Sequence, residues 1–350
     1  MERAKIMPDR FDLLKRLGSG NFGEVWLAFD PGLGVQRAVK IIPPDRIPDK
    51  TNFFREAQVL KAAEHSNVVK VEDTGTLDDG RVYVAMQYMR RGSLDDEAKG
   101  SYVVTSRARR IMIDVLRGLE WAHAKGILHR DIKPGNILIG DNRAGVLSDF
   151  GLAIARGVTD PVGMTDYVYV LHLAPEVNTP RDWSIAADIF ACGVTLYRLL
   201  NGDRYLPAIS PASVASAIQA GSFPDRNAYR EFVPRSLRQL VNKAIHVDPS
   251  KRFASASDMR HALEQVNVCM NWEETPLVDG QRWNGSWGVR HLVVERRRDS
   301  QHTWSVEYRK GSSPRQCRRV VALCKTGLGA RDSVILVRKI LQDAVLGRRG

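Results

Sequence analysis

The chain contains His129-Arg130-Asp131-Ile132-Lys133-Pro134-Gly135-Asn136 near its middle, followed by the apolar run Ile137-Leu138-Ile139 and then by Asp149-Phe150-Gly151. Phosphoryl transfer needs a carboxylate to orient the attacking hydroxyl, oxygen ligands for Mg²⁺, and cations to spread the charge on the transferred group. This stretch supplies all three kinds of side chain, namely Asp131, Asn136, Lys133 and Asp149. Chance rarely assembles such a set in this order, because each residue type makes up only about 5% of an average chain. The segment therefore predicts an active site for phosphoryl transfer.

A glycine-rich segment, Gly18-Ser19-Gly20-Asn21-Phe22-Gly23, lies nearer the N-terminus between two strand-like stretches. Glycines let the backbone approach phosphate oxygens closely and donate main-chain N–H groups to them. Taken alone, the pattern also fits a hairpin turn or a dinucleotide fingerprint. Here it leads into a strand, residues 24–29, and not into a helix, which argues against a dinucleotide-binding βαβ unit.

Ala38-Val39-Lys40 ends the next strand-like stretch. A lysine among apolar residues usually extends to solvent, and the alternative is a point charge for nucleotide phosphates. Glu56 lies on the predicted helix that follows. It either pairs with Lys40 and holds that lysine in place, or it is an exposed carboxylate on the helix surface.

Together these segments resemble the eukaryotic-type Ser/Thr protein kinases found in bacteria, over roughly residues 11–267. The resemblance rests on the glycine loop, Val25, Ala38, Lys40, Glu56, residues 129–136, Asp149-Phe150-Gly151, Ala174-Pro175-Glu176, Asp188, Gly193 and Arg252. It implies a bilobal α+β fold with a β-rich N-lobe and a helical C-lobe, and ATP and Mg²⁺ as cofactors.

The resemblance also implies a role for each catalytic side chain. Lys40 is expected to contact the α/β-phosphates and to pair with Glu56. Asp131 is expected to orient the substrate hydroxyl, and Lys133 to contact the γ-phosphate. Asn136 and Asp149 are the expected Mg²⁺ ligands.

The nucleotide site is implied in the same way. Met86 corresponds to the gatekeeper, and Gln87 to Met89 correspond to the hinge that holds adenine. The residues expected to surround the nucleotide are Gly18, Gly20, Gly23, Val25, Ala38 and Leu138. Glu176 and Arg252 are expected to form a buried, structural ion pair.

Two departures from the family pattern bear on the substrate. The family usually places a threonine five residues before the alanine of Ala-Pro-Glu, where it contacts the catalytic aspartate and lysine, but this chain has Tyr169 there. A non-protein acceptor therefore remains an alternative to a protein substrate. The chain also lacks the membrane span that many bacterial relatives carry, which argues against a cell-wall-sensing role.

The activation segment, between Asp149 and Glu176, contains Thr159, Thr165 and Tyr167. Arg130, which precedes the catalytic aspartate, is placed as in relatives that receive a phosphate from this segment. We predict autophosphorylation there, with Thr165 as the best candidate. A pseudokinase scaffold is the competing hypothesis, but it predicts the loss of at least one of Lys40, Asp131, Asn136 or Asp149, and all four are present.

The order of apolar patterns predicts the domain organisation. A kinase domain is expected at residues 11–268, with an N-lobe at about 11–89 and a C-lobe at about 90–268. Residues 269–280 carry acidic side chains and a proline and predict a linker. Residues 281–350 predict a small basic α+β domain, a β-meander with strands at 281–287, 290–296, 303–309 and 317–324, followed by a helix at 332–345.

Positive charge is concentrated in that last domain. The chain has a net charge of +12, and residues 270–350 contribute +8 of it, from 16 Lys+Arg and 8 Asp+Glu. Arginine clusters such as 296–298, and the aromatic residues Trp283, Trp287, Trp304 and Tyr308 as exposed candidates, favour a nucleic-acid-binding module. The alternative is a structural extension that packs on the C-lobe, because alternating aromatics in strands are more often core.

The remaining features predict a soluble cytoplasmic protein. The four cysteines are scattered, with no C-x-x-C pair, which indicates reduced thiols. No signal peptide opens the chain, and no apolar window is long enough to span a bilayer. Protein substrates are the expected partners, and no membrane partner is expected.

Overall fold

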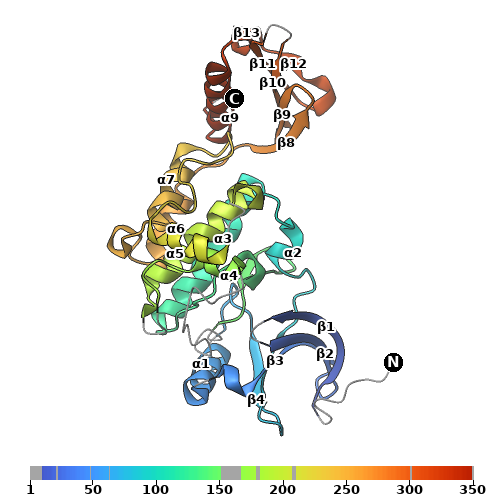
Figure 1. Cartoon of the computed structure of the whole chain (residues 1–350). Coiled ribbons are helices and arrows are strands. Elements are labelled where there is room, and N and C mark those ends of the chain that lie inside the picture. The colour runs from blue at the N-terminus through green and yellow to red at the C-terminus, as the bar shows by residue number, and fades with distance from the viewer. Residues whose placement is uncertain are drawn as a thin grey trace.

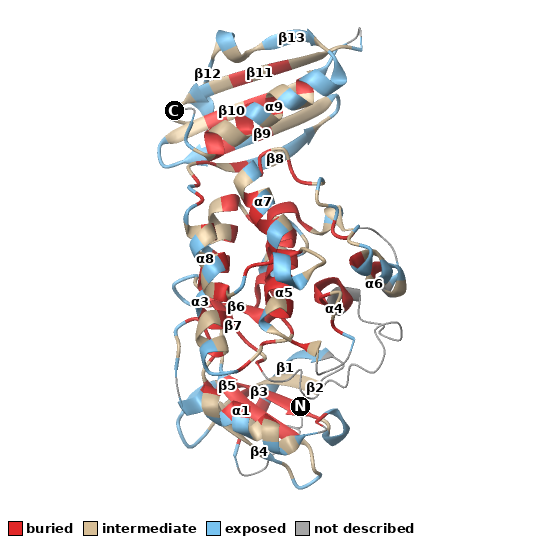
Figure 2. Ribbon diagram, turned by 90° about the vertical axis from the view of Figure 1, so that its left-hand side faces the viewer, coloured by how far each residue is buried: buried red, intermediate tan, exposed pale blue. Residues whose placement is uncertain are grey.

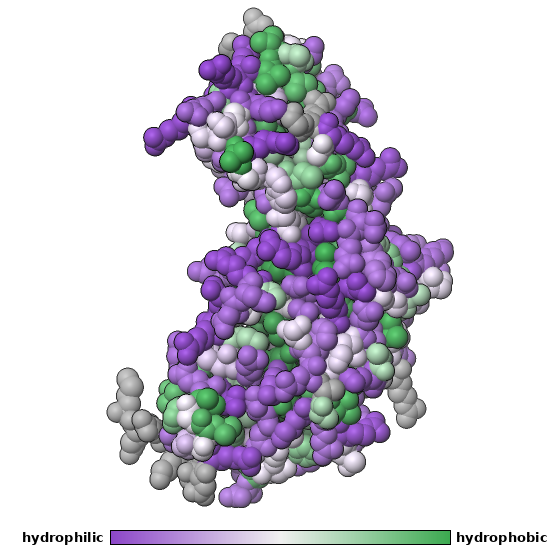
Figure 3. Space-filling view, turned by 180° about the vertical axis from the view of Figure 1, so that it is seen from behind, coloured by the Kyte–Doolittle hydropathy of each residue, from purple (hydrophilic) through white to green (hydrophobic). Residues whose placement is uncertain are grey.

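The computed structural model describes residues 10–20, 23–47, 49–62, 64–150, 167–178, 182–206, 210–299 and 302–348. Figure 1 shows three parts that follow one another along the molecule: a strand-rich N-lobe, a helical C-lobe and an appended sheet with one helix. The molecule narrows between the C-lobe and the appended part, which the space-filling view in Figure 3 also shows. The predicted bilobal α+β class is confirmed.

The N-lobe is an antiparallel sheet in the order β1-β2-β3-β5-β4, with one helix. Its elements are β1 (Asp12–Gly20), β2 (Gly23–Asp30), β3 (Val35–Ile42), α1 (Lys50–Ala62), β4 (Val71–Thr76) and β5 (Val82–Gln87). Gly23 has φ +108, and a Cβ there would lie 2.0 Å from the carbonyl oxygen of Ile41. Only glycine therefore lets β2 begin this close to β3, the strand that carries Lys40.

The C-lobe is built around α5, in which every residue from Ala187 to Asn201 is buried. Apolar residues occur on all sides of this helix, as expected for a helix at the centre of a lobe. The lobe consists of α2 (Leu94–Ala98), α3 (Thr105–Ala124), β6 (Ile137–Ile139), β7 (Gly145–Leu147), α4 (Tyr167–His172), α5 (Ile185–Asn201), α6 (Pro211–Gln219), α7 (Arg235–Ala244) and α8 (Ala256–Glu264). Ser255 caps α8, because its hydroxyl accepts a hydrogen bond from the backbone N–H of Asp258.

The appended part is a six-stranded sheet in the order β12-β11-β10-β9-β8, with β13 also paired to β11. It contains β8 (Asn271–Leu277), β9 (Gly280–Trp287), β10 (Arg290–Arg298), β11 (Trp304–Gly311), β12 (Arg318–Arg319), β13 (Lys325–Leu328) and α9 (Ala330–Val345). Figure 2 shows α9 lying across one face of this sheet. The buried side chains of that face belong to the same apolar cluster as the core of the C-lobe.

Two predictions for this part were wrong. The linker expected at 269–280 contains β8, whose Trp272 is fully buried and donates a hydrogen bond to the carbonyl of Leu341 in α9, 3.2 Å away. The strand expected at 317–324 is interrupted by the short helical turn Val321–Leu323, so only Arg318–Arg319 pair with β11 there. In both cases long-range packing overrides the local pattern.

Two of the four aromatic residues expected to be exposed are core residues. Trp283 and Tyr308 are only 3% and 4% exposed, and they pair with Val294 from either side on the face that meets α9. Trp304 lies under the guanidinium of Arg296, 3.5 Å from the centre of its ring. Trp287 is the exception, at 43% exposed. The buried rings of Trp283 and Tyr308 are therefore not available for stacking on bases.

Candidate active site

Three of the predicted site residues, Asp131, Lys133 and Asn136, lie on the loop between α3 and β6, where Asp131 is buried and surrounded by polar groups. Asn136 donates from Nδ2 to the carboxylate of Asp131, 2.7 Å away, and to its backbone carbonyl, 2.8 Å away. Lys133 Nζ lies 3.2 Å from the same carboxylate. One short turn, Pro134–Asn136, thus brings a carboxylate, an amide and a cation together.

Asp188, from the central helix α5, holds this loop in place. Its two carboxylate oxygens accept hydrogen bonds from the backbone N–H groups of His129 and Arg130, at 2.9 and 2.8 Å. His123, from α3, lies 2.8 Å from the same carboxylate. Asp188 is fully buried, so its three partners fix the backbone just before Asp131. The sequence analysis missed His123, because nothing in its local pattern distinguishes it from other polar residues of the helix.

Asp149 follows the hairpin β6–β7 and lies against Lys40. Lys40 Nζ is 2.7 Å from Asp149 Oδ1, and Asp149 has φ +63, in the left-handed region. Burial raises the pKa of Asp149, but the charge and the hydrogen bond of Lys40 outweigh burial, so the pKa of this carboxyl lies below its usual value. Asp149 is therefore ionised at neutral pH, as a metal ligand must be.

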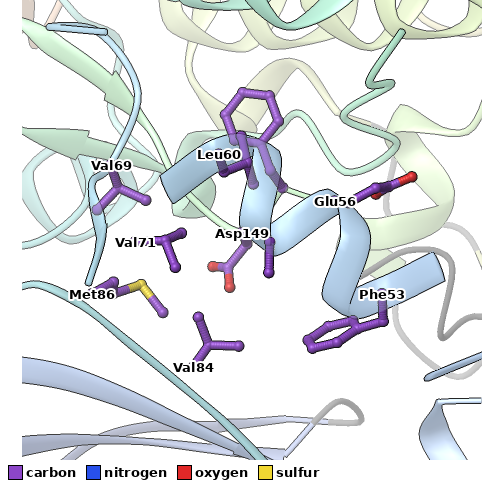
Figure 4. A pocket seen from close by; sticks show the side chains of 10 residues that line it. Phe53, Glu56, Leu60, Val69, Val71, Val84, Met86 and Asp149 are labelled. Carbon is purple, nitrogen blue, oxygen red and sulfur yellow. The ribbon is translucent and has the colours of Figure 1, made fainter. Parts of the chain in front are cut away.

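Glu56 does not pair with Lys40, in contrast to the prediction. Its nearest cation is Arg130, whose Nη1 lies 4.0 Å from Glu56 Oε1. Burial raises the pKa of Glu56 above its usual value, against the opposing charge of Arg130. Figure 4 shows the carboxylate of Asp149 pointing into the pocket between α1 and the sheet, whereas that of Glu56 points away from it. Among the described residues, Lys40 has one carboxylate partner, which is Asp149.

The pocket behind Asp149 is small and apolar, with room of about 30 Å³. Met86 and Val71 form part of its wall, and Phe150 closes it on one side. The ring of Phe150 also packs on His129, with ring centres 4.4 Å apart. Burial lowers the pKa of His129, so its ring is neutral. His129 thus supports the loop by packing and is not a charged group of the site.

The residues expected around the nucleotide belong to β1, β2, β3 and β6. Ala38 in β3 pairs with Met86 in β5, and Val25 and Leu138 pack against the same core from β2 and β6. A Cβ added to Gly18 would meet no atom within 4 Å, so the backbone there borders open space. Gln87 is exposed and Met89 is half-buried, at the passage from β5 to the C-lobe.

The expected ion pair between Glu176 and Arg252 is confirmed. Both guanidinium Nη atoms lie 2.7 Å from the two carboxylate oxygens, and the Arg252 side chain is fully buried. Arg252 also donates to the backbone carbonyls of Ala186, His246 and Val247. The pair therefore joins the end of the activation segment to the helical core.

Several sequence predictions lie outside the described residues. These are Asn21 and Phe22 of the glycine loop, Gly151, and the candidate phosphorylation sites Thr159 and Thr165. Tyr167 and Tyr169 belong to α4, but their side chains are not among those described.

The two lobes and the buried cluster of Asp131, Lys133 and Asn136 define a fold and a site suited to phosphoryl transfer. The chain matches the protein kinase domain over residues 11–265. It therefore belongs to the protein kinase family, and the predicted resemblance to bacterial Ser/Thr kinases is confirmed by its relatives.

One of these relatives is the serine/threonine-protein kinase PknJ of Mycobacterium tuberculosis, 34% identical over 264 residues, which covers 71% of this chain and 44% of the relative. The serine/threonine-protein kinase PknB of Mycobacterium leprae is 32% identical over 273 residues, covering 75% and 43%. This chain thus spans less than half the length of these curated relatives. A solved structure of Rad53 in complex with AMP-PNP matches with a TM-score of 0.60 and 25% identity, over 73% of this chain and 65% of that one.

In the part of the chain that the structure describes, no helix is both long and apolar enough to cross a bilayer. The same part contains no cluster of three or more His, Cys, Asp or Glu side chains that could hold a metal by themselves. A metal site made by Asn136 and Asp149 would therefore need further ligands, such as phosphate oxygens and water, which is the usual coordination of Mg²⁺.

Proposed function

We propose that the chain is an ATP- and Mg²⁺-dependent kinase that transfers the γ-phosphoryl group to Ser or Thr hydroxyls of protein substrates. The observation that carries this proposal is the buried cluster of Asp131, Lys133 and Asn136 on one loop. A carboxylate that is fixed by two neighbours can orient an attacking hydroxyl without rearranging, and this preorganisation is the main contribution that a protein makes to phosphoryl transfer.

In this mechanism Asp131 accepts a hydrogen bond from the substrate hydroxyl and takes its proton as the new bond forms. Lys133, 3.2 Å from that carboxylate, is placed to neutralise negative charge on the transferred group. Asn136 uses Nδ2 for both of its hydrogen bonds to Asp131, so Oδ1 is the atom suited to bind a metal. When bound, Mg²⁺ would supply charge neutralisation between Asn136 and Asp149.

Lys40 is expected to change partner in the active form. Asp149 cannot serve fully as a metal ligand while Lys40 occupies one of its oxygens at 2.7 Å. Transfer of Lys40 from Asp149 to Glu56 would free that oxygen, and it would give the buried Glu56 carboxylate a cation closer than Arg130, which is 4.0 Å away. The described arrangement is thus, in this proposal, a form in which phosphoryl transfer is switched off.

The nucleotide is proposed to lie between the lobes, against Val25, Ala38 and Leu138, with its phosphates beside Gly18, Gly20 and Gly23. Gln87 and Met89 are the proposed hinge residues. Support comes from Val25 and Leu138, which pack against the apolar core that contains Ala38, and from the open space beside Gly18.

A Ser/Thr protein acceptor is favoured by the names of the relatives PknJ and PknB. Tyr169 stands where the family usually has threonine, so a non-protein acceptor is the alternative to a protein substrate. We propose that the enzyme acts in the cytoplasm, where ATP is abundant and where its four cysteines, which are free thiols, stay reduced.

The proposal is tested with the purified chain, radiolabelled ATP and Mg²⁺, using a generic protein acceptor and an RNA acceptor side by side. We expect label on the protein acceptor and on the chain itself. Asp131→Asn should leave ATP binding largely intact and suppress transfer by several orders of magnitude, since the hydroxyl loses its proton acceptor. Near-normal transfer by Asp131→Asn would refute the assigned mechanism, and label on RNA alone would refute the protein substrate.

A further inference from the structure

A large groove lies between the C-lobe and the appended domain, with a volume of about 1180 Å³. One wall is α7 with the end of α8, and the other wall is α9 with the residues that follow it. Figures 1 and 2 show α9 above α7, at the end of the C-lobe farther from the N-lobe. The groove is therefore separate from the catalytic loop and from the nucleotide site.

The rim of this groove is cationic. Among the described residues that line it, five carry a positive charge and one, Asp343, carries a negative charge; the five are Arg235, Lys243, Arg338, Lys339 and Arg348. Within the described part of the chain, none of these five forms an ion pair with a carboxylate. Some arginines of the appended sheet differ in this respect, since Arg282 and Arg297 both pair with Glu295, and Arg309 pairs with Glu307.

A sixth cation, Arg238, shows how crowded this charge is. Its Nε is buried, and within the described residues it has no hydrogen-bond partner. Burial, and then the nearby charge of Arg338, lower the pKa of Arg238, with a smaller contribution from Arg235. The charge of Arg338, from α9, thus repels the guanidinium of Arg238, from α7. Binding of an anion would relieve their repulsion.

The floor of the groove is apolar. Leu240, Phe253 and Val266 come from the C-lobe side, and Ile335 and Leu346 from the side of α9. Ile335 is 52% exposed, which is unusual for a large aliphatic side chain beside a core helix face. A ligand that fills the groove would therefore meet apolar surface below and positive charge at the edges.

We propose that this groove binds an acidic segment of a protein partner, with apolar side chains on its floor and carboxylates against its cationic rim. Apolar anchors in a groove between helices, flanked by complementary charge, are a common mode of peptide recognition. A nucleic acid fits less well, because bases stack on exposed aromatic faces. The aromatic lining residue Phe253 is buried, and Lys243 Nζ lies over it at 4.3 Å.

This inference does not depend on the kinase activity and is tested by binding alone. The probe is a fluorescein-labelled synthetic peptide in which glutamates alternate with leucine and phenylalanine, added to the full chain over a salt series. A poly-glutamate peptide and a single-stranded oligonucleotide of equal charge are the comparison ligands. The test variant is Arg235→Glu with Lys339→Glu, one exposed side chain from each wall. The matched control is Arg318→Glu with Lys325→Glu, which changes the net charge equally on exposed residues of β12 and β13.

We expect the amphipathic peptide to bind in a salt-dependent way, and the test variant to bind it roughly tenfold more weakly while the control variant binds it normally. Ile335→Ser should weaken the amphipathic peptide but not poly-glutamate. Equal binding to the test and control variants would overturn the proposal. The absence of peptide binding at low salt would also overturn it. The same holds if the oligonucleotide binds more tightly than the peptide and its binding is lost in the test variant. Unchanged thermal unfolding of each variant shows that the fold is intact.

Discussion

Glu274, in β8, helps to attach the appended domain to the C-lobe. We expect a small change to this side chain to weaken that attachment strongly. Its carboxylate contacts Arg230 of the C-lobe, and both side chains are almost fully buried, at 6% and 5% exposed. Arg204 Nη2, largely exposed, lies 2.9 Å from the same oxygen. The backbone N–H of Glu274 donates to the hydroxyl of Tyr102, 2.9 Å away. The carboxylate is thus the negative partner in a buried ion pair between β8 and the C-lobe.

Glu274→Gln keeps the shape of the side chain and removes its charge. The buried guanidinium of Arg230 then has no counter-charge, and loss of one partner of a buried ion pair costs about 3–5 kcal/mol. Arg230 keeps its hydrogen bond to the carbonyl of Asn201, at 2.7 Å, and its contact with the ring of Tyr102, at 3.9 Å. Because these contacts remain, we expect a loss of stability at the lower end of that range, about 3 kcal/mol.

The assay is urea unfolding of the full chain, followed by tryptophan fluorescence, with limited proteolysis to detect release of the appended domain. Arg204→Met is the control, because an exposed ion pair contributes at most about 1 kcal/mol. The double variant Arg230→Met with Glu274→Gln should recover most of the loss, since no buried charge is left unpaired. A loss for Glu274→Gln no larger than that for Arg204→Met would refute the reasoning.

Three further predictions concern the kinase domain. Glu56→Gln should increase the free energy of unfolding at neutral pH, because burial penalises the ionised form of Glu56. The variant should also lose less stability than the parent as the pH rises through the raised pKa of Glu56. Its kinase activity should fall; urea unfolding across pH and a kinase assay measure the two effects. Arg252→Lys should cost about 3 kcal/mol of stability, since lysine cannot make the fork to Glu176 or reach the three carbonyls, and calorimetry of the variant measures this. Active enzyme should carry phosphate on Thr165, and Arg130→Ala should remove the activation that this phosphate provides; mass spectrometry that finds full activity with an unmodified segment would contradict the prediction.

The catalytic loop was predictable because its geometry is local. Asp131 and Asn136 are five residues apart, and a single short turn suffices to join them by hydrogen bonds. The same holds for the helices of the C-lobe, whose apolar periodicity and caps lie within each segment. The family resemblance then added Glu176 and Arg252, a pair 76 residues apart that no local pattern would connect.

The partner of Lys40 was not predictable, because two carboxylates compete for it. Glu56 and Asp149 both lie within reach of β3, and Asp149 is 109 residues away in the sequence. The outcome depends on how α1 sits against the sheet and on the arrangement of Arg130, which attracts Glu56 instead. Sequence identifies the three charged groups, but the choice among their pairings is a property of the packed conformation.

The segment around Glu274 illustrates the opposite error, in which a real element looks like a linker. Acidic residues and Pro276 are typical of linkers, and here they occupy an edge strand. Pro276 is tolerated because β8 pairs only with β9, so one side of the strand needs no hydrogen-bond donors. The acidic character of Glu274 is explained by Arg204 and Arg230, which come from a different part of the chain.

The sequence composition gives the amount of positive charge, but it does not tell which arginines are neutralised in the fold. The run Arg296–Arg298 stands out in the sequence, yet in the sheet its side chains alternate between faces, where Arg296 stacks on Trp304 and Arg297 pairs with Glu295. Other cations, which have no carboxylate partner among the described residues, come from α7 and from α9 and its end, about a hundred residues apart in the sequence, and they line one groove. An excess of positive charge can therefore be counted from the sequence. Where it remains available to a partner depends on which arginines the fold has already neutralised.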